Sequence, residues 1–519
     1  MSPPNFFDYS TWSRIGAVLL AIGFLFLVSV RYRKGLREIP GPFLASISPL
    51  DRILTTYSGR QFQKHLAYHQ KYGPIVRVGP IHVSVADSDQ ISVIYNITSK
   101  FDKSHFYTLF HAKSPRGNIP TVFSIVDPTG HKNLKRPVGA AFALSSLLDL
   151  ESLADDCTRI LERKLDGLQG RDIDFGTWLH WYAFDVITSI TFSNCLGFME
   201  KEEDVLGIIS AIEGRLVYNS IIGQVPSLHK LLLGNSLVSK FADMIPTLAR
   251  LNSSQYIVGF AAQQLEQRQN SKVEHGKKDI VARFKRTREG EQVMSDRELL
   301  GHAASNVFAG SDTTAISLRA MFYYLCKNPH IYKKLVEEIL SFDARGELSE
   351  YITYYEAQRM PYFQACMREA LRMHPAVGQL LERVVPEEGL MIGSSFLPSG
   401  TIVGINPWVA ARDKAVYGDD ADVFRPERWL DADEQTLKLM DRNWLAFGAG
   451  SRTCLGKNIS LMEMSKLVPQ LLRRYHVELA DPKAEWELFD YWFVQQEGLR
   501  CILARREKEQ GDLEGGGQT

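Results

Sequence analysis

The most apolar segment of this chain lies close to its N-terminus. Residues 15–30, sixteen in all, carry no charged side chain, and four basic residues follow within residues 31–37. A helix of that length spans roughly 24 Å, and a start at Trp12 extends it toward the ~30 Å of a bilayer core. The basic residues predict that the chain after them lies in the cytosol. A run without a basic start that ends in Arg and Lys argues against a cleaved signal peptide.

Amphipathic helical patterns dominate the rest of the chain, and no linker, repeat or low-complexity stretch interrupts residues 45–505. The longest pattern covers residues 295–328. It opens at a capping box, Ser295 with Glu298 three positions later, and stops before Pro329. The chain therefore divides into three predicted parts: a transmembrane anchor with its basic stretch (1–38), one large domain (39–504) and a disordered, charged and Gly-rich tail (505–519).

Composition argues against two classes of protein. Lys plus Arg and Asp plus Glu both number 60 among 519 residues, so the net charge is zero and nothing indicates a nucleic-acid partner. The six cysteines show neither C-x-x-C pairs nor zinc-ligand spacing. This usage fits reduced thiols in the cytosol better than the disulfide framework of a secreted protein.

One cysteine stands in an unusual loop, Phe447-Gly448-Ala449-Gly450-Ser451-Arg452-Thr453-Cys454-Leu455-Gly456. Its glycines permit positive φ and a close approach of the backbone to a ligand. Backbone N–H groups and the start of the helical pattern at residues 459–472 would stabilise a thiolate. Arg452 can donate to an anionic group of a cofactor. The alternative is a buried structural cysteine beside a glycine turn, and the Phe and Arg at fixed offsets argue against it.

This decapeptide resembles the haem-ligand loop of the cytochrome P-450 superfamily, the haem-thiolate monooxygenases, whose pattern is Phe-x-x-Gly-x-Arg-x-Cys-x-Gly. The resemblance extends from Pro40 to about Leu503. It implies a single large domain of the cytochrome P-450 fold, mainly α with a small β lobe. We expect the lobe to be built from residues 75–95 and 380–405.

Haem b (iron protoporphyrin IX) is the cofactor that the resemblance implies, with Cys454 as the axial ligand of the iron. A thiolate in that position favours O–O cleavage by electron donation. His131 and Lys135 fall where the family usually has Trp and Arg, so either Lys135 or Arg136 could contact a haem propionate. A solvated surface charge is the alternative for each basic residue. The implied haem contacts are Phe447, Gly448, Arg452, Arg383, His131 and Lys135.

A polar interruption lies in the middle of the longest helical pattern, at Ala309-Gly310-Ser311-Asp312-Thr313-Thr314. Glycine inside a helix costs about 1 kcal/mol relative to alanine, and a kink with back-bonded Ser and Thr side chains is the structural explanation. The segment resembles the family's distal-helix motif, in which small residues leave room for dioxygen. By that resemblance Asp312 is the acid and Thr313 the alcohol that relay protons to the bound oxygen.

Glu369 and Arg372 lie three positions apart in the helical pattern of residues 361–375, so their side chains share a face and can pair. Apolar neighbours indicate that this helix is buried. The two residues resemble the family's Glu-x-x-Arg pair, and Arg428 its later Pro-Glu-Arg-aromatic motif. The resemblance implies one buried ion-pair network behind the haem loop, whereas a solvated surface pair is the alternative.

Apolar side chains around the implied haem are the candidates for substrate contact. The family's topology places such contacts in residues 101–126, 215–239, 306–309, 377–381 and 493–494. Each of these side chains fits core packing equally well. The candidates are Phe106, Phe110, Ile222, Phe308, Ala309, Leu380 and Phe493.

The activity implied by the resemblance is that of a membrane-anchored monooxygenase. It would insert one oxygen atom from O2 into an apolar small molecule, by hydroxylation or oxidative O- or N-dealkylation. Electrons would come from NADPH through NADPH-cytochrome P-450 reductase, with cytochrome b5 as a further donor. The anchor implies a single-pass protein of the endoplasmic reticulum membrane, in contact with lipid. Residues 380–386 and 404–408 resemble the fungal branch that includes pisatin demethylase, which implies secondary metabolism or detoxification.

Two other classes of haem protein stay open. A haem-thiolate isomerase or dehydratase works without an external reductase. The Asp312-Thr313 pair argues against it, because such an enzyme needs no proton relay to dioxygen. A non-catalytic haem-binding protein would need neither substrate loops nor a reductase. NADPH-dependent turnover with a reductase separates all three.

Overall fold

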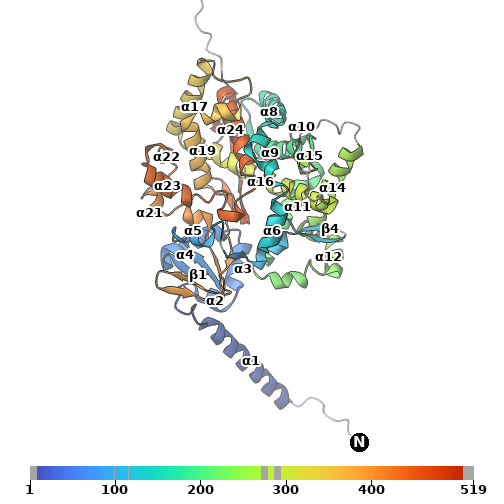
Figure 1. The fold of residues 1–519 in the computed structure, drawn as a ribbon, viewed down its shortest axis with the longest axis vertical. Coiled ribbons are helices and arrows are strands. Elements are labelled where there is room, and N and C mark those ends of the chain that lie inside the picture. Colours follow the sequence, from blue (N-terminus) through green and yellow to red (C-terminus); the bar gives the residue numbers. More distant parts are fainter. Residues whose placement is uncertain (1–8, 99, 115, 271–278, 286–293, 507–519) are drawn as a thin grey trace, which may run out of the picture.

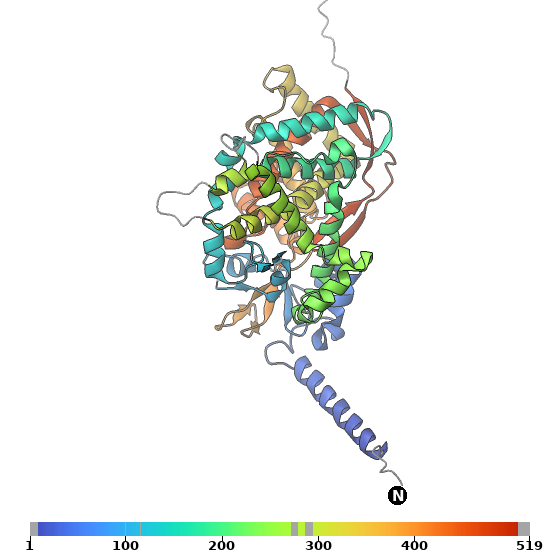
Figure 2. The same cartoon turned by 90° about the vertical axis from the view of Figure 1, so that its right-hand side faces the viewer.

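The computed structural model describes residues 9–98, 100–114, 116–270, 279–285 and 294–506. Helices make up most of this part of the chain, and a small sheet lies at the end of the domain from which the N-terminal helix α1 extends (Figure 1). The view at a right angle shows α1 reaching away from the domain (Figure 2). The predicted class, mainly α with a small β lobe, is confirmed.

The helices are spread along the described chain, with the strands and short turns between some of them. They are α1 (Tyr9–Arg31), α2 (Phe43–Ile47), α3 (Leu50–Tyr57), α4 (Gln61–Tyr72), α5 (Gln90–Ile94), α6 (Pro128–Lys135), α7 (Leu144–Leu148), α8 (Glu151–Asp166), α9 (Phe175–Phe192), α10 (Phe198–Lys201), α11 (Ile208–Ile222), α12 (Ser236–Asp243), α13 (Pro246–Leu251), α14 (Ser254–Asn270), α15 (Ile280–Lys285), α16 (Asp296–Lys327), α17 (Pro329–Ala344), α18 (Tyr354–Gln358), α19 (Pro361–Met373), α20 (Pro407–Ala410), α21 (Lys414–Tyr417), α22 (Arg428–Asp431), α23 (Glu434–Asn443) and α24 (Lys457–Arg474). Short 3₁₀ turns are η1 (His105–Phe110), η2 (Gly139–Phe142), η3 (Val205–Gly207), η4 (Pro226–Lys230) and η5 (Gly450–Arg452).

The strands are β1 (Ile75–Arg77), β2 (His82–Val85), β3 (Asp102–Lys103), β4 (Ala112–Ser114), β5 (Gly117–Ile119), β6 (Asp172–Asp174), β7 (Arg383–Val384), β8 (Leu390–Ile392), β9 (Ser395–Leu397), β10 (Ile402–Gly404), β11 (Tyr475–Leu479), β12 (Glu487–Tyr491), β13 (Phe493–Glu497) and β14 (Arg500–Arg505). The predicted lobe is a sheet of five strands in the order β1-β2-β10-β7-β3. Strands β2 and β10 are parallel and the other neighbours antiparallel. Strand β3 was not anticipated, because two residues are too few to show a period of two; it places Lys103 opposite Arg383.

Helix α16 crosses the helical region, where it packs against α9, α14, α19 and α24. The predicted capping box is present at its start: Ser295 accepts from the N–H of Glu298, and Glu298 accepts from the N–H of Ser295. Most side chains along its 32 residues are buried. The helix therefore holds its central residues at a fixed place inside the domain.

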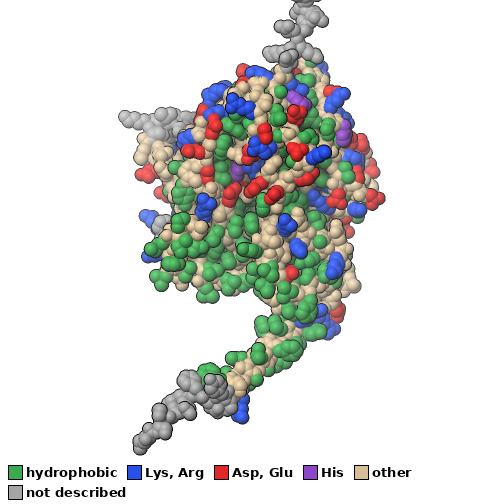
Figure 3. Space-filling view, turned by 180° about the vertical axis from the view of Figure 1, so that it is seen from behind, with side chains coloured by type: hydrophobic (Ala, Val, Ile, Leu, Met, Phe, Trp, Pro, Cys, Tyr) green, Lys and Arg blue, Asp and Glu red, His purple; other side chains and the backbone are tan. Residues whose placement is uncertain are grey.

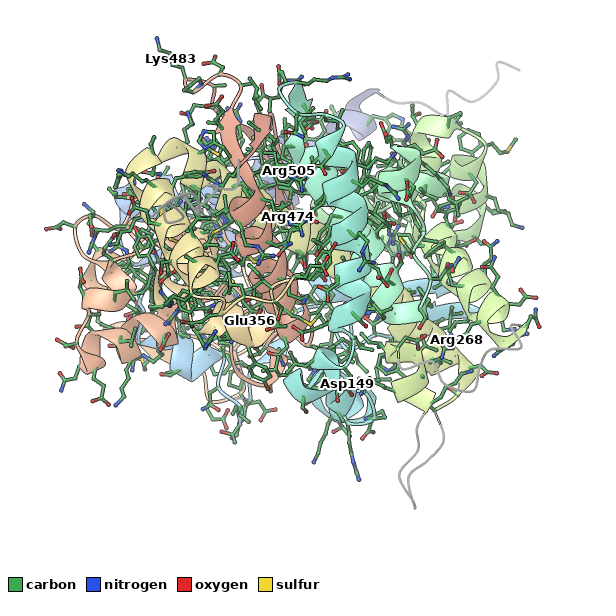
Figure 4. The ribbon with its side chains drawn as sticks, turned by 90° about the horizontal axis from the view of Figure 1, so that it is seen from above. Asp149, Arg268, Glu356, Arg474, Lys483 and Arg505 are labelled. Carbon is green, nitrogen blue, oxygen red and sulfur yellow. The ribbon has the colours of Figure 1, made fainter. Side chains whose placement is uncertain are left out.

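Ion pairs fasten α24 and the last strand, β14, to α8. Arg474, the last residue of α24, pairs with Glu162 of α8 at 2.9 Å, and Arg505 of β14 pairs with Asp166 at 3.0 Å. Figure 4 labels both arginines beside α8. Residue 505, with which the predicted tail begins, thus still belongs to a strand, and residues 507–519 lie outside the described part of the chain.

Helix α1 is mostly exposed, and its residues Trp12–Arg31 are long and apolar enough to cross a membrane. A second stretch of that kind, Val205–Ile222, is more than half buried in the domain, as for a core helix. The end of α1 is held by Arg77 of β1, a fully buried side chain. Its guanidinium donates to the carbonyls of Val30 at 2.8 Å and Arg31 at 2.9 Å. Carbonyls at a helix C-terminus lack partners within the helix, and a cation there is favourable.

Exposed apolar side chains gather on the part of the domain nearest to α1 (Figure 3). They come from α2, α3 and the segment between η4 and α13, and each is more than half exposed. The residues of this apolar face are Phe43, Tyr57, Leu231, Leu237, Phe241 and Met244.

Candidate active site

A cavity of about 300 Å³ lies between α16 and the Cys454 loop. Ala309, Gly310 and Thr313 line it from α16, and Cys454 lines it from the loop. Packing also favours glycine at position 310, because a Cβ there would lie 2.8 Å from Ile187 Cδ1 on α9. The polar interruption seen in the sequence is therefore the place where the central helix borders the cavity.

Glycines shape the Cys454 loop. Gly448 and Gly450 have φ of 68° and 66°, and a Cβ at Gly450 would overlap the carbonyl of Tyr95, so glycine is required there. The N–H of Cys454 donates to the carbonyl of Phe447 at 2.9 Å. Phe447 and Gly448 both line the cavity.

The Cys454 sulfur opens to the cavity but lies deep within the protein. Burial raises the pKa of its thiol, while the backbone N–H groups of Gly456 and Lys457 act in the opposite direction. Helix α24 begins at Lys457, so its N-terminus points toward the sulfur loop. Backbone donors and a helix N-terminus beside a thiol are the features that support a metal-bound thiolate.

Basic side chains hold the loop at one end of the cavity. Arg452 donates to the carbonyls of Ile125 and Val126, both at 2.8 Å. Lys135 Nζ donates to the carbonyl of Ser451 at 3.0 Å, so Lys135 reaches the Cys454 loop. These bonds join the Cys454 loop to the segment that precedes α6.

Positive charge accumulates at this end. Burial and then the neighbouring cations, Arg452 first, lower the pKa of His131 to about 3, which leaves it neutral at neutral pH. Burial and then Arg383 lower the pKa of Arg452 to about 10. Arg383 and Arg452 together line a second, small cavity. Lys103, which the sequence did not single out, lines the main cavity through its place on β3. Closely spaced cations fit the two propionates of haem b, and the thiol and the space above it fit its iron and ring.

The two residues of the predicted proton relay face different directions. Thr313 lines the cavity and its hydroxyl donates to the carbonyl of Ala309 at 2.8 Å. Asp312 is buried outside the cavity, with Oδ1 2.8 Å from Nε2 of His180 on α9 and, among the described residues, no partner for Oδ2. Adjacent helical residues are about 100° apart, which explains the divergence. His180 was missed; its one signal in the sequence is a polar side chain within an apolar helix.

The predicted ion-pair network is assembled and buried. Arg372 binds both oxygens of Glu369 at 2.8 Å, and Arg428 Nε donates to Oε1 at 2.9 Å. Trp429 adds a donor to Oε2 at 2.9 Å, which the sequence analysis did not foresee. Burial alone would raise the pKa of Glu369, but the hydrogen bond and charge of Arg372, with Arg428, lower it. The solvated surface pair is thereby excluded.

The candidate substrate wall is partly corrected. Phe110, Phe308, Ala309 and Phe493 line the cavity. Phe106 does not: it packs against Tyr107, Phe110 and Trp492, whose ring centroids lie 5.3–5.5 Å away. Leu380 packs in a small cluster with Val76 and Val78, and Leu381 faces the cavity in its place. Ile222 belongs to the cluster around Leu109 and Tyr218. The topology of the family indicates which segments lie near the cavity. The direction of each side chain within such a segment depends on the local backbone conformation.

Comparison with known proteins agrees with this geometry. The family model of cytochrome P-450 matches residues 40–499. The cytochrome P-450 monooxygenase cicH of Emericella nidulans is 38% identical over 501 residues, which cover 94% of this chain and 99% of the relative. Pisatin demethylase of Fusarium vanettenii is 34% identical over 490 residues, 94% of this chain and 92% of the relative.

A third relative is longer than this chain. The cytochrome P-450 monooxygenase mpaDE' of Penicillium brevicompactum is 35% identical over 506 residues, which cover 95% of this chain but 58% of that protein. The family uses haem b, dioxygen and electrons from NADPH. With the family model and these relatives covering nearly its whole length, the chain belongs to the cytochrome P-450 family of haem-dependent monooxygenases.

Proposed function

We propose that Cys454 holds the haem iron as a thiolate and that an organic substrate is oxidised in the space between the haem and α16. One observation carries this assignment: a single cavity has a thiol on one wall and Ala309, Gly310 and Thr313 on the wall across it. Haem in such a site supplies the activation of dioxygen and the insertion of one oxygen atom, by hydroxylation or oxidative dealkylation.

Each of the other site residues has a proposed task. Arg452, Arg383, His131 and Lys135 hold the propionate end of the haem, directly or through the loop that Lys135 binds. The Thr313 hydroxyl faces the cavity and donates the proton that oxygen cleavage requires. Asp312 resupplies that proton from the α9 side, since its carboxylate lies against His180.

Membrane attachment follows from α1 and from the apolar face. The helix leaves the domain on the side where exposed apolar residues gather (Figure 3), so one bilayer surface could contact both. We assign the chain to the endoplasmic reticulum membrane as a single-pass protein with a cytosolic domain that begins at residue 39 and includes strand β14. Its electron donors are NADPH-cytochrome P-450 reductase and cytochrome b5. The fungal relatives support a place in secondary metabolism, with a largely apolar small molecule as substrate.

The ferrous carbonyl spectrum tests the assignment. We expect the strongly red-shifted Soret band of thiolate ligation in the wild type and its loss in Cys454→Ser. Turnover with NADPH and reductase would then separate a monooxygenase from an isomerase or a non-catalytic haem protein. An unshifted, histidine-like band in the wild type would contradict the role of Cys454.

A chain that starts at Ile39 tests the domain boundary. It should bind haem as the full chain does and leave the integral membrane fraction, although the apolar face would keep some of it peripherally attached. Loss of haem binding in this shorter chain would count against a separate anchor.

A further inference from the structure

A buried cation lies in the cavity, outside the set of basic residues assigned to the haem. Arg215 of α11 is 4% exposed and lines the cavity with Asn219, one turn later on the same face. Its guanidinium donates to two backbone carbonyls, Leu109 at 3.2 Å and Leu251 at 3.4 Å. A guanidinium has five N–H groups, so these two long bonds leave donor capacity unused within the described part of the chain.

No carboxylate among the described residues neutralises Arg215. Glu213 is about 200° away around the helix, where it accepts from Gln495 at 3.4 Å and lies near Asp312. Besides the two carbonyls, the guanidinium interacts with the ring of Tyr218, whose centroid lies 5.0 Å from the guanidinium carbon. Burial lowers the pKa of Arg215 to about 10, which leaves it cationic at neutral pH.

Asn219 is the second unsatisfied group on this wall. It is 1% exposed, and within the described chain its Oδ1 has no hydrogen-bond partner and its Nδ2 donates to none. Of these two atoms, only Nδ2 can donate to an anionic ligand. A buried polar group without a partner costs about 1–3 kcal/mol, and an unpaired charge costs more. An anionic ligand at this wall would accept hydrogen bonds from the unused N–H groups of Arg215 and from Nδ2 of Asn219, and would thereby offset part of this cost.

The surroundings reinforce the positive charge. None of the described residues that line the cavity is Asp or Glu. Lys113 lies close enough for Arg215 to contribute, after burial, to lowering its pKa, and Asp243 acts on Lys113 in the opposite direction. Arg215 belongs to α11, whereas the basic residues that fit the haem propionates come from α6, β7 and the Cys454 loop, so the two sets of cations lie on different elements.

We infer that the substrate carries a carboxylate, which Arg215 binds through charge-assisted hydrogen bonds with Asn219 beside it. Arginine and carboxylate form short, often bidentate bonds, and in a site screened from water such a bond discriminates strongly against a neutral analogue. The apolar body of the substrate would rest on Phe110, Phe308 and Phe493. This inference rests on the proposed function and specifies its substrate class.

Matched acid and ester probes test the inference on the haem-loaded full chain. Benzoate, 2-naphthoate and biphenyl-4-carboxylate would each be compared with its methyl ester by equilibrium dialysis, which reports binding without turnover or any change in haem spectrum. The variants are Arg215→Met, Arg215→Lys and Asn219→Leu. Phe308→Leu serves as the control, because it alters the apolar wall and leaves the cation in place.

The wild type should bind the best acid at least tenfold more tightly than its ester. Arg215→Met should abolish that preference by weakening the acid alone, Arg215→Lys should restore part of it, and Asn219→Leu should reduce it several-fold. Phe308→Leu should weaken acid and ester alike. Equal binding of acid and ester by the wild type would overturn the inference, as would equal weakening of both by Arg215→Met.

The ferrous carbonyl spectrum of the same samples keeps the two proposals apart. A normal thiolate band with no acid preference would overturn the carboxylate inference alone. An acid preference without that band would overturn the proposed function and leave the anion site standing. If Arg215→Met does not retain haem, two other measurements still decide the outcome. They are the ratio of acid to ester affinity in the wild type and the change of that ratio in Arg215→Lys and Asn219→Leu.

Discussion

The buried network behind the Cys454 loop and the region of α11 and α16 differ in how far the hydrogen-bonding capacity of their polar groups is satisfied. Behind the loop, both oxygens of Glu369 are bound by donors from Arg372, Arg428 and Trp429. On α11 and α16, by contrast, Asn219 Oδ1 and Asp312 Oδ2 have no partner in the described chain. In the first region the polar groups bind one another and stabilise the fold. In the second region some polar groups stay without a protein partner, and they are available to a ligand or to a proton.

Breaking the satisfied region should have the largest effect. Arg428→Ala leaves Glu369 buried with an incomplete set of donors, at a cost of about 3–5 kcal/mol against a typical stability of about 5–15 kcal/mol. We expect most of the haem to be lost, measured as haem per chain after purification. The neighbouring Arg425 is the matched control, because its side chain is 41% exposed in a surface pair with Asp420; Arg425→Ala should cost about 1 kcal/mol or less. Full haem content in Arg428→Ala would show that the network does not support the site.

Two phenylalanines separate packing from ligand contact. Phe106→Ala should cost about 3–5 kcal/mol in the free energy of unfolding, because the side chain is buried in an aromatic cluster. Phe308→Ala removes a ring from the cavity wall, so ligand affinity should fall while stability changes less. Denaturant unfolding and ligand dialysis on both variants check this. A stable Phe106→Ala protein with weakened ligand binding would place Phe106 back on the substrate wall.

Thr313→Ala should separate oxygen consumption from product formation. Haem binding and reduction should survive, because the residue has no part in the network or the thiolate loop. Product per NADPH should fall at least about tenfold and hydrogen peroxide should rise, since general acid–base groups contribute factors of this size or larger. Asp312→Asn should instead slow NADPH use as a whole. Full coupling in Thr313→Ala would mean that water or a substrate group delivers the proton.

His180→Leu should give the smallest of these effects. It removes the partner of Asp312, a hydrogen bond worth about 1.4 kcal/mol or tenfold in rate. We expect slower NADPH oxidation with an unchanged fraction of peroxide, which distinguishes a residue that positions the acid from the alcohol that donates. His180→Gln retains a donor and should recover part of the rate. A rise in peroxide in His180→Leu would contradict this division of tasks.

The features that the sequence predicted are those whose partners lie close together along the chain or within one motif. The Cys454 loop, the capping box at Ser295 and the Glu369–Arg372 pair all depend on spacings of a few residues. The site residues that were missed depend on distant contacts: His180 meets Asp312 across 132 positions, and Lys103 reaches the cavity through a two-residue strand paired with β7. No local pattern encodes such contacts, because tertiary packing sets them.

The direction in which each side chain points is the second property that the sequence leaves undetermined. Residues 215–239 and 377–381 were expected near the substrate, and each range does contribute to the cavity. Within them, however, Arg215 and Leu381 face inward while Ile222 and Leu380 pack elsewhere. Both faces of α11 carry polar and apolar residues, so its pattern alone could not show which side borders the cavity.

The hydrogen bonds from Arg77 to the last carbonyls of α1 affect how the domain is oriented relative to α1. A flexible tether would let the domain rotate freely above the bilayer, whereas a helix end bound to β1 transmits its tilt to the domain. If α1 crosses the bilayer as proposed, its angle would set how deeply the apolar face enters the lipid, and with it the height of the cavity above the membrane. The buried side chain of Arg77 would thereby influence whether substrates dissolved in lipid or in water reach the enzyme first.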